Sequence, residues 1–269
     1  MFICWVDDRL DHHDIGAVPG ELERFTAPLR DAFTSVGRTR PVATGDAGLA
    51  AAVLAGLWER TAAGMPESWR RRFVDDYTDF LDACEEEMAV RRSGARLSLT
   101  DYIGLRRRTI TLLPMLNVLE RTGHTLLVEH PQVDDQVREL RWTLADVVGW
   151  ANDLASHTHD EAASQDSLLS LIARRDACTP AEAAARATVM MERRRAEFTA
   201  PPRRCAQHPA AHRLGRYVDL VERFMAATLH WLAVTSRFAP IPGPTGPATA
   251  TEPVASGPGA EAEVRRAMR

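Results

Sequence analysis

Lysine is absent from this sequence of 269 residues, so all 33 of its basic side chains are arginines. With 37 acidic residues the net charge is −4, which leaves no strong positive field to hold a nucleic-acid backbone. The four cysteines are scattered without a CxxC pair, as is typical of buried, reduced thiols in the cytoplasm. No apolar run approaches the roughly 20 residues of a membrane span. We therefore expect a cytoplasmic protein without a nucleic-acid partner.

Strand-like alternation is also missing, whereas helical periodicity runs through most of the chain. Apolar residues make up 45% of the sequence and charged residues 26%, which is the balance of an ordinary folded domain. We predict one all-α domain over residues 1–238, followed by a disordered tail rich in Pro, Gly and Ala at 239–269. Apolar spacings of three and four predict helices within 49–64, 69–88, 99–119, 133–156 and 214–238.

Two local signals refine this prediction. Thr179 followed by Pro180 and, three residues after the threonine, Glu182 predicts the start of a helix, because threonine caps a helix and proline fits its first turn. Pro114 lies inside the 99–119 segment and is expected to kink or break it, because proline lacks an amide donor and clashes with the preceding turn.

An acidic cluster follows directly on the apolar residues at the start of the sequence. Asp7 and Asp11 are four residues apart, so on a helix they lie about 40° apart on one face. Mg²⁺ would turn their mutual repulsion into ligation, because it takes one or two carboxylates together with phosphate oxygens and water. Asp8 points about 100° away from Asp7 and is less suited to share the ion. A solvated acidic helix end explains the same pattern.

A second polar cluster extends the apolar face of the 133–156 helix. Asn152, Ser156 and Asp160 fall within about 80° on one helical face. An amide, a hydroxyl and a carboxylate all offer the hard oxygen ligands that Mg²⁺ prefers. The cluster therefore indicates a metal site, and a polar helix end with ordinary hydrogen bonds is the alternative.

Together these clusters resemble the metal motifs of bacterial class I terpene synthases. The segment 7–11 (DDRLD) matches the aspartate-rich DDxxD motif, and 152–160 matches the NDxxSxxxD/E motif. The segment 102–109 is similar to the one that carries the family's diphosphate-sensing Arg, and 231–238 is similar to its C-terminal Arg-Tyr element. The resemblance covers residues 1 to about 240 and implies an α-helical barrel with the two metal motifs facing each other across its mouth.

The resemblance also implies the cofactor, the substrate and the roles of individual residues. Three Mg²⁺ ions, or Mn²⁺ in their place, would bind the diphosphate of a linear prenyl substrate, most often farnesyl diphosphate, which would ionise and cyclise to a sesquiterpene. Arg106 and Arg237 would donate to the diphosphate, and Trp231 would offer a π face to the carbocation. Thr109 and Ile110 stand where the family has its linker and effector residues, and some members form homodimers. The implied metal ligands are Asp7, Asp8, Asp11, Asn152, Ser156 and Asp160.

Three departures from the family pattern accompany the resemblance. Asp7 is almost at the first residue, so we expect the barrel to lack the helices that normally precede the aspartate-rich motif. His159 stands where a Lys or Arg usually precedes the last metal ligand, and Phe238 replaces the usual Tyr at the substrate diphosphate.

Two other functions remain open. A truncated, non-catalytic remnant of a terpene synthase would keep the motifs without activity. An HD-type metal phosphohydrolase would use His12 or His13 with Asp14, together with 159–160, because His and Asp suit such sites. The second alternative leaves Asn152 and Ser156 without a role.

Overall fold

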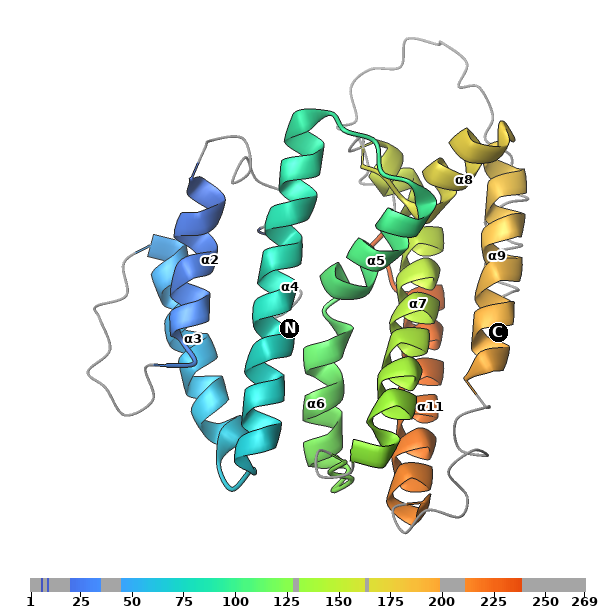
Figure 1. The fold of residues 1–269 in the computed structure, drawn as a ribbon. Helices are drawn as coiled ribbons and strands as arrows, with labels where there is room; N and C mark the ends of the chain where they lie inside the picture. Colours follow the sequence, from blue (N-terminus) through green and yellow to red (C-terminus); the bar gives the residue numbers. More distant parts are fainter. Residues whose placement is uncertain are drawn as a thin grey trace.

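A computed structural model describes residues 6, 9, 20–34, 45–127, 131–162, 165–198 and 211–238 of the chain. Every regular element within these ranges is an α-helix, which confirms the predicted all-α class (Figure 1). The predicted tail at 239–269 lies outside them. The helices are α2 (Glu21–Asp31), α3 (Gly45–Ala62), α4 (Glu67–Ser93), α5 (Leu99–Thr109), α6 (Leu112–Thr122), α7 (Pro131–Ala162), α8 (Leu168–Asp176), α9 (Pro180–Glu197) and α11 (Ala211–Val234).

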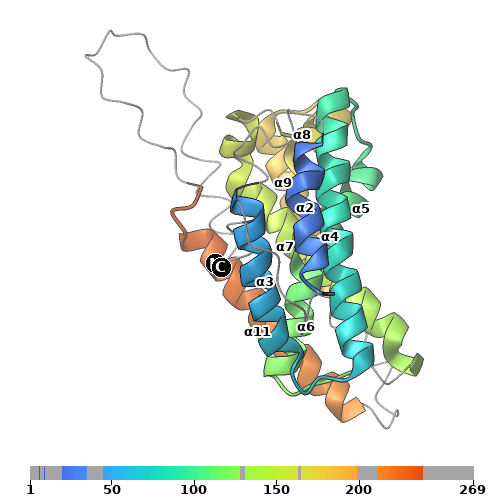
Figure 2. The same cartoon turned by 90° about the vertical axis from the view of Figure 1, so that its left-hand side faces the viewer.

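The long helix α4 separates two groups of helices. Helices α2 and α3 pack together on one side of it, and α5 and α6 pack on the other. Helix α7 contacts α5, α6, α8, α9 and α11, so it is the centre of the second group. Most of these helices run roughly along one axis, with the short α8 at one end, as Figures 1 and 2 show.

The core between α2, α3 and α4 is aromatic. Phe73 contacts four other rings at centroid distances of 5.0 to 6.3 Å, in both stacked and edge-on geometry. Aromatic pairs contribute about 0.5–1.5 kcal/mol beyond the area that they bury. Val6 is fully buried in the same cluster. The rings belong to Phe33, Trp58, Trp69, Phe73, Tyr77 and Phe80.

The core around α7 is mainly aliphatic. Its buried stretch from Leu140 to Ala151 packs against α9 and α11, with the indole of Trp142 at the surface as an exception. Helix α9 begins at the predicted signal: the Thr179 hydroxyl accepts from the Glu182 amide, and the Glu182 carboxylate accepts from the Thr179 amide. This capping box satisfies two otherwise unpaired donors at the helix start.

The 99–119 segment is broken into α5 and α6 near Ile110–Pro114, as predicted, and the residue at the break is Thr111. Thr111 has the left-handed conformation (φ 60°, ψ 13°), which is strained for a β-branched residue. Pro114 lies in the first turn of α6, where a missing amide is tolerated. The proline leaves the carbonyl of Ile110 without the donor that a continuous helix would supply.

Charged and amide side chains join α4 to α6 and α7. Arg72 of α4 donates to the fully buried Glu120 of α6 at 2.5 Å. Arg141 of α7, itself buried, donates to Asp76 of α4 at 2.5 Å and to the Asn117 amide oxygen of α6 at 3.0 Å. Buried charges require such partners, because an unpaired one is strongly destabilising. We call this set the charged layer. It fixes the position of α4 along its axis relative to the second group of helices, and it consists of Arg72, Asp76, Asn117, Glu120 and Arg141.

Candidate active site

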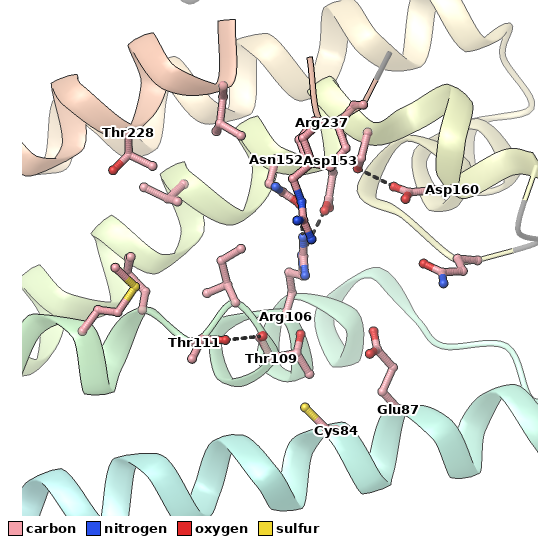
Figure 3. A pocket seen from close by; sticks show the side chains of 18 of the residues that line it. Cys84, Glu87, Arg106, Thr109, Thr111, Asn152, Asp153, Asp160, Thr228 and Arg237 are labelled. Atoms are coloured by element: carbon pink, nitrogen blue, oxygen red, sulfur yellow. Dashed lines mark hydrogen bonds and ion pairs between the residues drawn. The ribbon is translucent and has the colours of Figure 1, made fainter. Parts of the chain in front are cut away.

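A cavity of about 730 Å³ opens between α4, α5, α6, α7 and α11 (Figure 3). One end is polar and lies where α5 meets the C-terminal half of α7. The remainder is apolar, with lining side chains from both sides of the α5–α6 break and from α11. Its apolar lining includes Ile110, Leu112, Met115, Val148 and Phe224.

The three predicted ligands from the second metal motif lie in this cavity. Asn152, Ser156 and Asp160 project from successive turns of α7, and all three line its polar end. The Ser156 hydroxyl donates to the Asp160 carboxylate at 2.6 Å. The sequence spacing therefore correctly predicted which side chains share one face.

This donor set fits a hard divalent cation. An amide, a hydroxyl and a carboxylate line one end of the same cavity, and Mg²⁺ and Mn²⁺ prefer oxygen ligands. Within the described ranges no three His, Cys, Asp or Glu side chains form a metal-binding group. The set on α7 contains only one residue of those types, Asp160, so the fit depends on the amide and hydroxyl oxygens.

Most of the first metal motif falls outside the described ranges. Asp7, Asp8 and Asp11 lie outside the described residues, as do His12, His13 and Asp14 and the side chain of His159. Of this segment, Arg9 is described, and it forms an ion pair of 2.5 Å with Asp46 at the start of α3.

Arg106 of α5 reaches across the cavity to the second metal motif. Its Nε donates to Asp153 at 2.9 Å, and a terminal nitrogen donates to the Asn152 amide oxygen at 2.7 Å. The Arg106 side chain is 18% exposed, so the guanidinium is largely shielded and still borders the cavity. Figure 3 shows it between α5 and α7, pointing at these two partners.

Asp153 is the residue of this site that sequence reasoning missed. Its carboxylate, 2% exposed, accepts from the Tyr102 hydroxyl at 2.6 Å, from the Leu168 amide at 3.1 Å and from Arg106. Burial, and then the nearby Asp153 charge, raise the pKa of Tyr102 well above its usual range, so the tyrosine remains a donor. With three donors, Asp153 anchors the guanidinium and the start of α8.

A glycine of α7, Gly149, lies where Arg106 of α5 approaches this helix. A Cβ atom built on Gly149 would lie 3.4 Å from Arg106 Cγ and 4.0 Å from Ile110 Cγ1. Glycine inside a helix costs about 0.5–1 kcal/mol relative to alanine. The added Cβ would make ordinary van der Waals contact with the alkyl part of Arg106, so the space at this position also admits alanine.

The other two arginines of the 106–108 run bind elsewhere. Arg107 makes a bidentate pair with the buried Asp146 of α7, at 2.6 and 2.8 Å. Arg108 pairs with Asp79 and Glu86 of α4, at 2.9 and 2.5 Å. Each arginine of the run thus fixes α5 to a particular point on a neighbouring helix, and of the three only Arg106 lines the cavity.

The break between α5 and α6 forms part of the cavity wall. Thr109 and Ile110, the predicted linker and effector positions, both line the cavity. Thr109 is buried, and its carbonyl accepts from the Thr111 hydroxyl at 3.3 Å. Both predicted positions therefore border the same cavity as the second metal motif.

The predicted residues after α11 also border the cavity. Trp231 lines it, although 45% of the residue is exposed, so it is an edge of the wall and not a buried core residue. Arg237 and Phe238 follow the end of α11 and line the same cavity. The Arg237 guanidinium lies 5.9 Å from the Phe238 ring centroid, a cation–π contact.

No helix in the described part of the chain combines the length and apolarity needed to cross a membrane.

The profile of terpene synthase family 2, C-terminal metal binding, matches residues 1–197. Pristinol synthase from Streptomyces pristinaespiralis is 30% identical over 241 residues, covering 86% of this chain and 64% of that enzyme. (−)-β-Caryophyllene synthase from Saccharothrix espanaensis is 29% identical, covering 85% and 64%. This chain therefore spans slightly less than two thirds of the length of either enzyme.

Solved structures show the same fold. Germacradien-4-ol synthase from Streptomyces citricolor superimposes with a TM-score of 0.71 at 25% identity, covering 87% of this chain and 75% of that one. Linalool/nerolidol synthase from Streptomyces clavuligerus superimposes with a TM-score of 0.73 at 24% identity, covering 86% and 78%.

Proposed function

The chain belongs to terpene synthase family 2, and from this we propose that it is a Mg²⁺-dependent class I terpene synthase that ionises a linear prenyl diphosphate and cyclises the carbocation. One observation carries the proposal. Asn152, Ser156 and Asp160 of α7 gather with Arg106 at the polar end of a cavity whose remaining wall is largely apolar. Such a cavity suits a substrate with a diphosphate head and a hydrocarbon tail. Its volume of about 730 Å³ falls within the usual range for ligand sites.

The polar end would hold the diphosphate. Asn152, Ser156 and Asp160 would ligate one metal ion, and Asp7, Asp8 and Asp11 would supply the ligands for the others. Bound Mg²⁺ would stabilise the negative charge that develops on the leaving diphosphate. Arg106 and Arg237 would donate hydrogen bonds to the diphosphate oxygens, to which a planar guanidinium can bind in a bidentate way. His159 and Phe238 would border the same group and would contribute less, being mostly neutral and apolar respectively.

The apolar part of the cavity would hold the isoprenoid chain and exclude water. Aliphatic side chains from both sides of the α5–α6 break would shape the chain for cyclisation. The carbonyl of Ile110 and the indole of Trp231 would face the carbocation, one as a dipole and the other as a π surface. Thr109 would connect Arg106 to this break, since it lies one helical turn after Arg106. None of these groups acts as a nucleophile, so catalysis would be electrostatic and steric.

Farnesyl diphosphate is the substrate that we propose, with a sesquiterpene as the product. The caryophyllene synthase is described as cyclising (2E,6E)-farnesyl diphosphate, and its similarity covers most of this chain. The similarity favours a cyclase over the phosphohydrolase alternative, which leaves Asn152 and Ser156 of the cavity without a role.

Product formation from geranyl, farnesyl and geranylgeranyl diphosphates, measured by gas chromatography–mass spectrometry with Mg²⁺ and with EDTA, tests the proposal. We expect a cyclic hydrocarbon or alcohol from farnesyl diphosphate only with Mg²⁺. Asn152→Ala should abolish it, whereas Thr158→Ala, an exposed position on the same helix, should not. A folded protein that forms no product from any of the three substrates would instead support the non-catalytic remnant.

A further inference from the structure

Two groups, the Arg106 guanidinium and the proposed metal ion, would bind the amide oxygen of Asn152. Arg106 donates to this oxygen at 2.7 Å in the ligand-free protein. The same oxygen is the proposed metal ligand, so the inference below rests on the proposed function. An amide oxygen has two lone pairs and could accept both partners geometrically. Their charges oppose this, because a divalent cation and a guanidinium on one oxygen would lie only a few ångströms apart in a partly dehydrated cavity.

We infer that Arg106 competes with the metal ion for Asn152, and that the substrate diphosphate relieves the competition by drawing the guanidinium away. The diphosphate carries negative charge and would lie between the two cations, so it favours metal binding and an Arg106 turned toward its oxygens. Arg106 then regulates metal binding in the free enzyme as well as contacting the substrate.

The surrounding contacts restrict how far Arg106 can move. Its Nε is held by Asp153, whose carboxylate is fixed by the Tyr102 hydroxyl and the Leu168 amide. Its alkyl part lies across Gly149. The guanidinium can therefore exchange the partner of its terminal nitrogen while Nε stays on Asp153. The exchange needs a small rotation within the cavity and no movement of a helix.

This arrangement predicts a coupling between metal and diphosphate. In the absence of diphosphate the metal must displace Arg106 from Asn152, so its affinity is low. Diphosphate raises that affinity, and by linkage the metal raises the affinity for diphosphate by the same factor. Removal of Arg106 should reduce this coupling. The metal alone should bind more tightly, and diphosphate should raise the metal affinity by a smaller factor.

Equilibrium binding of Mn²⁺, followed by the paramagnetic resonance signal of the free ion, measures this directly with and without inorganic diphosphate. For Arg106→Gln we expect Mn²⁺ alone to bind about tenfold more tightly than it does to the wild type, within the usual range of allosteric couplings. Diphosphate should then enhance Mn²⁺ binding by a factor about tenfold smaller than in the wild type.

Two controls separate this effect from a general change in charge. Arg108→Gln removes the same charge from the same helix but from a side chain that pairs with α4, so its Mn²⁺ affinity should match the wild type. Adding Asn152→Ala to Arg106→Gln should remove the gain, because the contested oxygen is then absent. Arg106→Lys keeps the charge without the guanidinium fork and should retain part of the gain.

The outcomes distinguish the inference from the function on which it rests. One outcome is that Arg106→Gln and Arg108→Gln change the Mn²⁺ affinity equally, or that neither changes it, while diphosphate still enhances Mn²⁺ binding to the wild type. This outcome would refute the competition and leave the proposed metal site in place. If the folded wild type binds no Mn²⁺ with or without diphosphate, the proposed function fails and the competition with it.

Discussion

Helix α4 has aromatic contacts on one side and charged contacts on the other. Toward α2 and α3 it presents Trp69, Phe73 and Tyr77 to a cluster of rings. Toward α6 and α7 it presents Arg72 and Asp76 to buried polar partners. The ring contacts depend weakly on direction, because dispersion and burial do, although Arg30 of α2 also pairs with Asp82 and Glu85 of α4. The contact with α6 and α7 is directional, because hydrogen bonds require particular atoms at particular distances.

The difference shows why the candidate site lies on the charged side. A cavity that positions a diphosphate must hold its donors to within fractions of an ångström. Ion pairs that link α4, α5, α6 and α7 set the heights of the helices that line the cavity. The aromatic core supplies stability behind α4 without lining the cavity itself. Substitutions on the two sides of α4 should therefore differ in their effects on stability and on the shape of the cavity.

The largest expected effect comes from Arg141, at the centre of the charged layer. Arg141→Ala leaves Asp76 and the Asn117 amide oxygen without this donor, and removing one partner of a buried pair costs about 3–5 kcal/mol. The free energy of unfolding, measured by urea denaturation followed by circular dichroism, should fall by this amount. A loss below about 1 kcal/mol would show that the layer contributes little to holding α4.

A smaller loss is expected in the aromatic core. Phe73→Leu keeps an apolar side chain but removes a ring that contacts four others, so we expect a loss of about 2 kcal/mol. The same denaturation experiment measures it. The product distribution should be unchanged, since this side chain does not line the cavity. A changed distribution would mean that the ring cluster also sets the shape of the cavity.

Gly149→Ala should separate stability from activity. Alanine favours a helix by up to about 1 kcal/mol over glycine, so the melting temperature should stay the same or rise. The new Cβ would lie 3.4 Å from Arg106 Cγ, which is ordinary van der Waals contact, so the guanidinium should keep its partners and turnover should stay close to that of the wild type. Steady-state kinetics with a thermal melt checks both, and Gly104→Ala, where a Cβ meets open space, is the matched control.

The smallest effect is a pH dependence from Glu120. Burial raises the pKa of this carboxyl above its ordinary value of 4.5, although Arg72 and Arg141 oppose the shift. Because the folded state then binds the proton more tightly, the contribution of Glu120 to stability is fully present below pH 4.5 and declines as the pH rises through the raised value. Urea titrations across this range should show the decline.

Glu120→Gln provides the comparison for that decline, because glutamine has nearly the same shape and does not titrate. The difference in unfolding free energy between the wild type and this variant should become less favourable to the wild type as the pH rises. A difference that is constant with pH would contradict the raised pKa. Phe73→Leu, on the other side of α4, should show no such dependence.

The sequence predicted the parts of this site that depend on position along one helix. Asn152, Ser156 and Asp160 share a face because of the helical period alone. The α5–α6 break was expected near Ile110–Pro114 and lies there, at Thr111, with Pro114 in the first turn of the following helix, where a missing amide is tolerated.

Asp153 could not be predicted from spacing. It is offset by about 100° from Asn152 on α7, so it does not share the face that the spacing of Asn152, Ser156 and Asp160 defines. Its role depends on partners far away in sequence, Tyr102 and Leu168, which only the packing of α5 and α8 against α7 brings near. The available signals were Gly149, a glycine inside an apolar helix, and the run of three arginines at 106–108.

Helix α4 spans roughly 40 Å, as a helix of 27 residues does, and it is a wall of the cavity as well as the boundary between two cores. Evolution or a protein engineer can alter its cavity side, at Cys84 or Glu87, only while the rings and ion pairs elsewhere on the same helix keep their places. Trp231 of helix α11 lines the cavity but is half exposed, so it is less constrained by packing in a core. New products should therefore be sought first by varying the α11 wall, where a change of shape has the fewest structural consequences.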